Sequence, residues 1–473
     1  MIMSVRLLLR GAQIVTMDPA VGVVPRGDLL IEDRVIVAVG EDLDVTDTEV
    51  VDVSGHVIAP GMVDTHRHTW QTLARAICVD WTLADYFYGI RLAVSPAYTP
   101  ADVYLGNKLG AFEALNAGVT TMLDFSHCNN TPEHSDAAVT GLLDSGVRAK
   151  FCYGFFESSP FGPPYFTDHG KRVEDFERIS AGYFSGAGRV TLGVSLNEPG
   201  LVPFSNTRRE IEVAREHGAL IATHMGTVWQ MPSGFDELSR AGLLGSDLLL
   251  VHCNTLTGEQ WTRLADAGAK VSISVETELN MGMGRPVFAQ CVEHGVKPTL
   301  SCDVVSLNHG DLFSQARFGL GFKRWADTEH LNLAGKDVKQ VTTTTLEALQ
   351  WATINGAEAC GLGDQVGSIT VGKRADLMVV GGPGIGQHPV IDGAGTLIFQ
   401  TTPTDVRHVL VDGEFVKRDG VLVGHDLPKL LAEADEAAAR VLDRVRASGG
   451  RFPATPTDGF DGVTALALAN LAS

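Results

Sequence analysis

The sequence predicts an α/β protein: a (β/α)8 TIM barrel with a composite β-sandwich domain built from both termini. Two patterns support this. In the middle of the chain, short β-branched runs alternate with helical patterns, which is typical of βα units and a parallel sheet. At both ends, short apolar runs are separated by Gly, Asp and Pro, which indicates a small antiparallel sheet.

The first 55 residues resemble a β-meander. Its apolar runs cover residues 7–9, 14–16, 29–31, 35–39 and 50–53. The same texture returns at residues 367–380 and 406–423. We therefore expect one sandwich domain assembled from residues 1–56 and 364–425.

Eight apolar, β-branched runs follow one another in the middle of the chain. They cover residues 57–63, 119–124, 148–155, 190–196, 219–224, 247–252, 270–275 and 298–303. Helical patterns between them include residues 101–116, 136–145, 207–217 and 257–267. Eight units in about 250 residues is the size of a (β/α)8 barrel, which we expect over residues 57–363. A doubly wound open sheet is the alternative, but no G-x-G-x-x-G follows the first run.

The chain after the eighth run looks largely helical. Residues 312–325 and 341–360 have helical patterns, and residues 427–447 form an amphipathic helix within a C-terminal segment, 426–473. We expect this last segment to make packing or oligomer contacts.

The composition excludes several classes of protein. The chain has 473 residues, 44% of them hydrophobic, and a net charge of −20. Such a charge disfavours nucleic acid and anionic membranes as partners, because phosphates need a basic face. No run approaches the ~18 apolar residues of a spanning helix. Seven scattered cysteines without a Cys-x-x-Cys, and a start unlike an export signal, favour a cytoplasmic protein with reduced thiols.

Five potential metal ligands follow four of the eight runs. His66 and His68 are two residues apart, so both point to one side of an extended strand. His224, His252 and Asp303 end the fifth, sixth and eighth runs. Because barrel chemistry lies at the C-terminal strand ends, we expect these side chains to converge. Neutral imidazoles and a carboxylate suit Zn²⁺ or Fe²⁺ with one position open to water, whose pKa the ion lowers toward ~7.

Several stretches match the pattern of a known family. They are APGMVDTHRHTWQT, AGVTTMLD, LIATHMG, LLLVHCNTLT, LSCDVVS, WATINGAEACGLGDQVGSITVGKRADLMVV and HVLVDGEFV. On these stretches the chain resembles the amidohydrolase superfamily. The branch is that of cytosine deaminase-like, methylthioadenosine/adenosylhomocysteine deaminase-like and triazine hydrolase-like enzymes.

The resemblance implies a role for each of the five residues. His66, His68 and His224 would bind the metal. Asp303 would be a further ligand and would carry the proton of the attacking water. His252 would hydrogen-bond that water or the leaving-group side of the substrate. Binuclear members carry a bridging Lys after strand 4, and no Lys stands there in this chain. The resemblance therefore implies one divalent ion, Zn²⁺ first and Fe²⁺ as the alternative.

One motif departs from the family pattern. Related aminopurine and triazine enzymes have His-x-x-Glu after strand 5, and this Glu protonates a ring nitrogen. Here Thr227 stands at the Glu position, and a hydroxyl cannot act as an acid near pH 7. Glu276 or Glu278, after the seventh run, could supply the acid. Alternatively, both are solvated loop carboxylates.

Substrate contacts are expected from the segments after the first, second and fifth runs. Trp81 and Tyr86 belong to an aromatic stretch that crosses the barrel mouth in the family. His127 follows the second run, and Thr227 follows the metal ligand His224. Ordinary core packing or a loop position is the alternative for each.

The expected function is hydrolysis of a C–N bond in a small cyclic or aromatic nitrogen compound, in the manner of a deaminase. An amide, urea or carbamate hydrolase using the same residues is the alternative, because the ring-protonating acid is missing. A non-catalytic barrel that only binds a ligand is disfavoured, since all five site residues are present. The resemblance also implies a homodimer or larger homo-oligomer.

Overall fold

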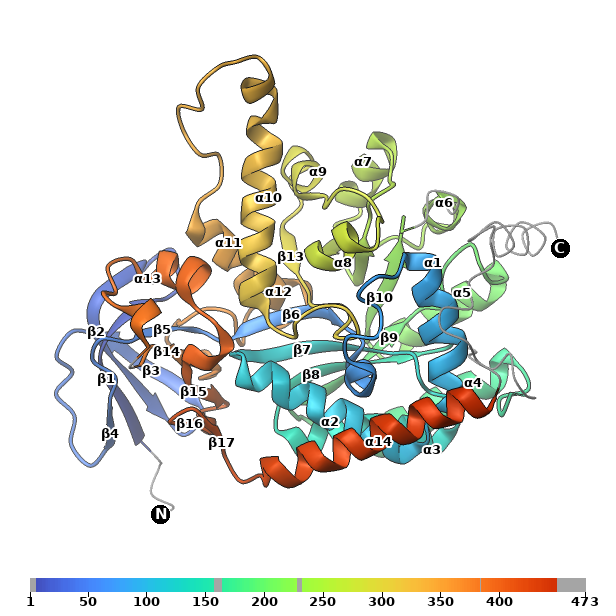
Figure 1. The fold of residues 1–473 in the computed structure, drawn as a ribbon, viewed down its shortest axis with the longest axis horizontal. Coiled ribbons are helices and arrows are strands. Elements are labelled where there is room, and N and C mark those ends of the chain that lie inside the picture. The colour runs from blue at the N-terminus through green and yellow to red at the C-terminus, as the bar shows by residue number, and fades with distance from the viewer. Residues whose placement is uncertain (1–5, 157–163, 228–231, 383, 449–473) are drawn as a thin grey trace.

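The computed structural model describes residues 6–156, 164–227, 232–382 and 384–448. These residues build two sheets, one at each side of the molecule in Figure 1. The larger body is a parallel barrel wrapped by helices, and the smaller is a mixed sheet to which both termini contribute. The predicted fold class is therefore confirmed. The predicted domain boundaries stay a prediction.

The barrel sheet has eight strands in chain order, and neighbouring strands are parallel. The strands are β6 (Met62–Arg67), β7 (Val119–Ser126), β8 (Arg148–Gly154), β9 (Val190–Ser195), β10 (Leu220–Met225), β11 (Leu248–His252), β12 (Lys270–Ile273) and β13 (Pro298–Leu300). A bridge between Arg67 and Asp303 joins the last strand region to the first and closes the barrel.

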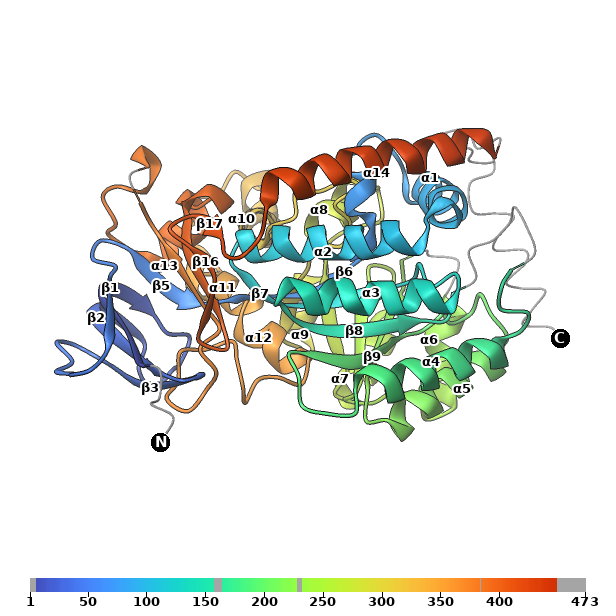
Figure 2. The ribbon, with the colours of Figure 1, turned by 90° about the horizontal axis from the view of Figure 1, so that it is seen from below.

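Helices cover the outside of the barrel (Figure 2). They are α2 (Pro100–Asn116), α3 (Pro132–Ser145), α4 (His169–Tyr183), α5 (Phe204–Glu216), α6 (Pro232–Arg240), α7 (Gly258–Asp266), α9 (Phe288–Glu293), α10 (Leu312–Leu333), α11 (Thr345–Trp351) and α12 (Ile354–Ala359). Local capping explains where several begin. Thr99 and Asp102, for example, form a capping box at the start of α2, which satisfies two free backbone amides.

Short helical segments lie at the C-terminal end of the barrel. They are η1 (Thr69–Ala74), α1 (Leu83–Tyr86), η2 (Phe87–Val94) and η3 (Ser95–Ala97) after the first barrel strand, and α8 (Val275–Asn280) after β12. The segment η2 is a π-helix, a form often found at functional sites.

The second sheet runs β17-β16-β15-β14-β5-β1-β2-β3, with β4 paired to β1. Its strands are β1 (Arg6–Val15), β2 (Val23–Glu32), β3 (Val35–Gly40), β4 (Glu49–Asp52), β5 (Val57–Pro60), β14 (Leu377–Val380), β15 (Val406–Val411), β16 (Glu414–Arg418) and β17 (Val421–Leu422). The short helices η4 (Ile385–Gln387), α13 (Gly393–Gly395), η5 (Thr396–Gln400) and η6 (Pro403–Asp405) lie between β14 and β15.

The first predicted barrel run, residues 57–63, was wrong as a single strand. Its first half, β5, pairs with β1 and β14 in the second sheet, and only its end belongs to the barrel strand β6. Gly61 separates the two. A Cβ there would lie 2.1 Å from Oγ1 of Thr120, so only glycine lets the chain pass so close to β7.

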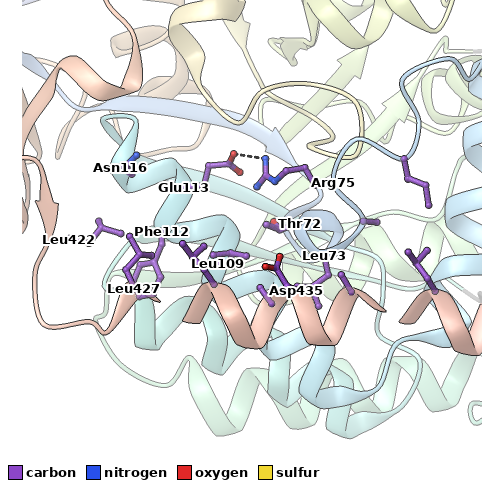
Figure 3. A pocket seen from close by; sticks show the side chains of 16 residues that line it. Thr72, Leu73, Arg75, Leu109, Phe112, Glu113, Asn116, Leu422, Leu427 and Asp435 are labelled. Carbon is purple, nitrogen blue, oxygen red and sulfur yellow. Dashed lines mark hydrogen bonds and ion pairs between the residues drawn. The ribbon is translucent and has the colours of Figure 1, made fainter. Parts of the chain in front are cut away.

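The last described helix, α14 (Leu427–Ala447), has the predicted bounds and lies along α2 (Figure 2). Apolar side chains of α14, α2 and η1 line a pocket between them, with the Arg75–Glu113 ion pair at one side (Figure 3). The tail beyond residue 448 lies outside the described residues. No helix in the described ranges is long and apolar enough to cross a membrane.

Candidate metal centre

Four histidines and one aspartate meet at the C-terminal end of the barrel. Nε2 of His66 lies 3.2 Å from Oδ1 of Asp303 and 3.3 Å from Nε2 of His224. Nε2 of His68 lies 3.5 Å from the same Oδ1, and Nε2 of His252 lies 3.9 Å from Oδ2. The structure thus brings together all five side chains singled out in the sequence. Their role as metal ligands stays a prediction.

The strand geometry explains this convergence. His66 belongs to β6 and His68 follows it, so their rings leave the backbone on the same side. At the end of β11 and after β13 the backbone is strained: φ is 75° at His252, 58° at Cys253 and 60° at Asp303. Left-handed backbone at non-glycine residues costs about 1–3 kcal/mol each and is concentrated at functional sites.

In three of the imidazoles, Nδ1 contacts an acceptor oxygen on the side of the ring away from the cluster. Nδ1 of His68 lies 3.1 Å from the carbonyl oxygen of Phe125, to which it donates. Nδ1 of His224 lies 3.3 Å from Oε1 of Glu198, and Nδ1 of His252 lies 3.1 Å from Oε1 of Glu278. Hydrogen bonds of this kind fix the tautomer of metal-binding histidines and leave the lone pair of Nε2 free.

The electrostatics of the cluster fit a divalent cation. Burial lowers the pKa of His66 and His68, and it lowers that of His224 to about 4, so these rings are neutral. Burial alone would raise the pKa of Asp303, but the hydrogen bond from His66 and the nearby histidines outweigh it and lower that pKa to about 2. The ligand atoms of His66, His68 and His224 lie within 4.8 Å of one another, and so do those of His66, His252 and Asp303. Neutral imidazoles with an ionised carboxylate are a ligand set for zinc or iron.

Of the two candidate acids, Glu278 reaches the cluster. Its buried carboxylate contacts Nδ1 of His252 and also accepts hydrogen bonds from the amide nitrogens of Asn254 and Ser274. The sequence suggested a free acid at this position, whereas the structure shows a carboxylate that holds His252 in place.

Glu276 lies on the same short helix, α8, but its carboxylate has other partners. It accepts a hydrogen bond of 2.7 Å from Nε2 of Gln315 on α10. Burial, with a smaller contribution from Asp311, raises its pKa to about 6. No hydrogen bond or ion pair joins Glu276 to the five clustered residues in the described part of the chain.

Two of the expected substrate contacts lie beside the cluster. The ring of His127 stacks on that of His68, with centroids 4.1 Å apart. Tyr86 is buried, and its hydroxyl accepts a hydrogen bond of 2.6 Å from Nε2 of Gln71. Burial raises the pKa of Tyr86, and the charge of Asp303 raises it further.

The other two expected contacts are placed less directly. The ring of Trp81 packs on Gly89 of η2, where a Cβ would lie 2.3 Å from it. Thr227 follows β10 by two residues and is half-buried. Residues 228–231, which come next, lie outside the described ranges.

Two charged residues at the site were missed in the sequence. Glu198 follows β9 and supports His224, as described above. Arg91 lies in η2, and its Nη1 is 3.6 Å from Oε1 of Glu198. Its guanidinium carbon lies 4.0 Å from the ring centre of Phe156. An arginine inside the apolar segment Phe87–Val94 was the available signal, because such a charge is seldom buried without a purpose.

Comparisons with known proteins agree with this geometry. A model of the amidohydrolase family matches residues 57–416. The chain is 28% identical to a 5'-deoxyadenosine deaminase of Methanosarcina barkeri over 456 residues, covering 93% of this chain and 99% of that protein. It is 26% identical to a 5-methylthioadenosine/S-adenosylhomocysteine deaminase of Acetivibrio thermocellus, with 92% and 99% covered.

Solved structures show the same fold. An adenosine deaminase from Xanthomonas campestris with bound zinc has a TM-score of 0.81 at 22% identity, covering 93% of this chain and 98% of that one. A mutant atrazine chlorohydrolase from Arthrobacter aurescens, in complex with zinc and atraton, has a TM-score of 0.80 at 20% identity, covering 91% and 100%. The resemblance stated from the sequence motifs is confirmed.

Proposed function

The chain belongs to the amidohydrolase family, and we propose that it is a metal-dependent hydrolase that removes an amino group from a small nitrogen heterocycle. The observation that carries this proposal is the convergence of four histidines and one aspartate at the C-terminal end of the barrel. The curated relatives named above are deaminases, which supports this reaction type.

We propose that His66, His68, His224 and Asp303 hold one divalent ion. Zinc is the first choice, because it is the ion in the related adenosine deaminase structure, and iron is the alternative. A bound ion of this kind makes hydroxide available near neutral pH by lowering the pKa of water toward ~7.

Asp303 is the proposed proton carrier. Its carboxylate is ionised at neutral pH, and its two oxygens face different partners: Oδ1 faces His66 and Oδ2 faces His252. It can therefore accept a proton from the attacking water at one side and deliver it to the leaving nitrogen at the other.

His252 is proposed to contact the reacting atoms of the substrate. Glu278 fixes Nδ1 of this ring, which leaves Nε2 directed toward Asp303 and the cluster. Glu278 thus acts through His252 as a positioning residue. Tyr86 and His127 are proposed to line the substrate pocket, together with Trp81 and Thr227 at its edge.

A second reaction type stays open because of Thr227. Ring deamination needs a proton donor for the ring nitrogen, and the hydroxyl of Thr227 cannot supply one near pH 7. Hydrolysis of an amide, urea or carbamate does not need that donor, so it is the alternative function on the same residues.

Metal analysis followed by a substrate screen separates these outcomes. We expect about one equivalent of metal, lost in His66→Ala and kept in His330→Ala, which changes an exposed histidine of α10. Ammonia released from amino-substituted purines, pyrimidines or triazines supports the deaminase. Cleavage of anilides, ureas or carbamates without ammonia supports the alternative. A protein that binds no metal contradicts both.

We further propose that the protein is a cytoplasmic homo-oligomer acting on a small molecule. All seven cysteines are free thiols and buried, which suits a reducing compartment. Size-exclusion chromatography with light scattering tests the assembly, and a monomer at micromolar concentration contradicts it.

A further inference from the structure

The guanidinium of Arg91 is buried beside the candidate metal centre and makes no hydrogen bond to the residues that the structure describes. Arg91 is only 4% exposed. Among the described residues its polar contact is the ion pair with Glu198, at 3.6 Å, beyond hydrogen-bond distance. Nε is fully enclosed without a partner, and none of its N–H groups donates to another residue in the described parts of the chain. Buried N–H donors are almost always paired, so this guanidinium requires an acceptor.

Two short contact paths place Arg91 next to the cluster. Arg91 and the candidate ligand His224 both contact Oε1 of Glu198, which connects the two residues. On the other side its guanidinium lies on the ring of Phe156, which in turn contacts the ring of His127. The stacking and the ion pair restrict how the guanidinium can turn, which is the condition for specific recognition.

His127, which contacts the same Phe156 ring, carries a second buried N–H group. Its Nδ1 accepts a hydrogen bond of 2.9 Å from Nε1 of Trp70. An indole nitrogen can only donate, so in the neutral ring the hydrogen of His127 is on Nε2. That Nε2 is buried, and no acceptor for it is found within the described ranges.

We propose that Arg91, with His127 beside it, binds an oxo oxygen of the substrate. This inference rests on the proposed function and narrows its substrate class to heterocycles that carry a ring carbonyl besides the C–N bond that is cleaved. A carbonyl oxygen has two lone pairs and accepts from N–H donors without bringing a further charge.

The charge balance favours an oxo group over a carboxylate. Glu198 already compensates the charge of Arg91, because its Oε1 lies 3.6 Å from Nη1 of that guanidinium. A substrate carboxylate would add an uncompensated buried charge beside Glu198, which is costly. A neutral oxo oxygen satisfies the donors at no such cost.

Matched substrates test the inference by turnover. The pairs are isocytosine with 2-aminopyrimidine, and guanine with 2-aminopurine, in which the second member lacks the oxo group and the ring N–H beside it. We expect Arg91→Met to lower kcat/KM for the oxo member about 10–150-fold, the value of a lost charged hydrogen bond. The value for the other member should change less than about 3-fold, since it never used the bond. An equal loss on both members overturns the inference.

The control variants separate recognition from folding. Arg208→Met removes an exposed arginine that also stacks on a phenylalanine, Phe204, and should leave both substrates unaffected. Metal content and unfolding temperature are measured for every variant. If Arg91→Met does not fold, Arg91→Lys keeps the charge but loses the planar fork, and the same selective loss is expected to be smaller.

A binding measurement keeps the inference independent of turnover. Dissociation constants of 4-pyrimidinone and of pyrimidine are measured with the metal-loaded protein by tryptophan fluorescence. Tighter binding of the pyrimidinone, lost in Arg91→Met, supports the oxygen site even if no deamination is found, in which case only the proposed reaction fails. Equal binding of both rings, no binding of either, or preference for pyrimidine-4-carboxylate overturns it.

Discussion

His66 and Asp303 are joined through both their backbones and their side chains. The amide of Asp303 donates to the carbonyl oxygen of His66 at 2.9 Å, and Nε2 of His66 lies 3.2 Å from Oδ1 of Asp303. The backbone bond also closes the barrel between its last and first strand regions. Barrel closure and the geometry of the candidate metal centre are therefore set by the same contact.

Replacing Asp303 by Asn should remove the proton carrier without opening the barrel. The side chain keeps its size, and the backbone bond to His66 does not depend on its charge. Loss of a general base typically lowers the rate about 10²–10⁴-fold. We expect a loss of that size in kcat at saturating metal, with circular dichroism unchanged. Activity within about 3-fold of wild type would rule out Asp303 as the proton carrier.

The pair Glu278→Gln and Glu276→Gln separates the two candidate acids, which lie two residues apart on α8. Loss of a carboxylate that supports a histidine typically costs about 10–100-fold in activity. Because Glu278 contacts His252 while Glu276 contacts Gln315, we expect the larger loss of kcat from Glu278→Gln, with metal content unchanged. The reverse order of the two losses would identify Glu276 as the missing acid.

Removing the metal should lower stability as well as activity. Without the ion, the proposed site leaves the charge of Asp303 among close-packed imidazoles. A ligand at 100 times its dissociation constant stabilises a protein by about 2.7 kcal/mol. We expect chelation to lower the unfolding temperature and added Zn²⁺ to restore it in the wild type but not in His68→Ala. An unfolding temperature that does not respond to chelation would contradict a bound ion at this site.

The five clustered residues could be predicted because the signal is local. A His-x-His pair and single residues at the ends of apolar runs need only the period of a strand and the topology of the barrel. The first run is a case in which the strand period alone does not predict the structure. Residues 57–63 are apolar throughout, and the division at Gly61 depends on pairing with β14, which is far away in sequence.

That Arg91 lacks a hydrogen-bond partner among the described residues could not be predicted, because this too depends on contacts between residues far apart in sequence. Its neighbours Phe156 and Glu198 follow β8 and β9, and only the closed barrel brings them to η2. Likewise, Glu278 looks like a free loop acid until His252 of the neighbouring strand is placed against it. Residues that act through contacts between strands leave no periodic pattern in the sequence.

Arg148 should be a major determinant of stability where the barrel meets the second sheet. It begins β8, and its guanidinium donates to Asp376 at 2.7 and 3.0 Å and to Asp412 at 2.7 Å. Both carboxylates are buried. Breaking a buried ion pair from one side costs about 3–5 kcal/mol, because the buried carboxylates lose a charged partner. We expect Arg148→Ala to lower the free energy of unfolding by that amount in urea denaturation.

The pH dependence of this loss follows from Asp412. Burial opposes its ionisation, but the charges and hydrogen bonds of Arg148 and Arg189 together outweigh burial and lower the pKa of Asp412 below its usual value. A carboxyl whose pKa is lower in the folded state stabilises the fold above its unfolded pKa and loses this effect as the pH falls through the folded value. The cost of Arg148→Ala should therefore be full at pH 7 and shrink below pH ~4. Lys171→Ala, which breaks an exposed pair with Glu174, should cost less than about 1 kcal/mol at either pH. If Arg148→Ala cost no more than this control at pH 7, the buried cluster would not stabilise the contact between the two sheets.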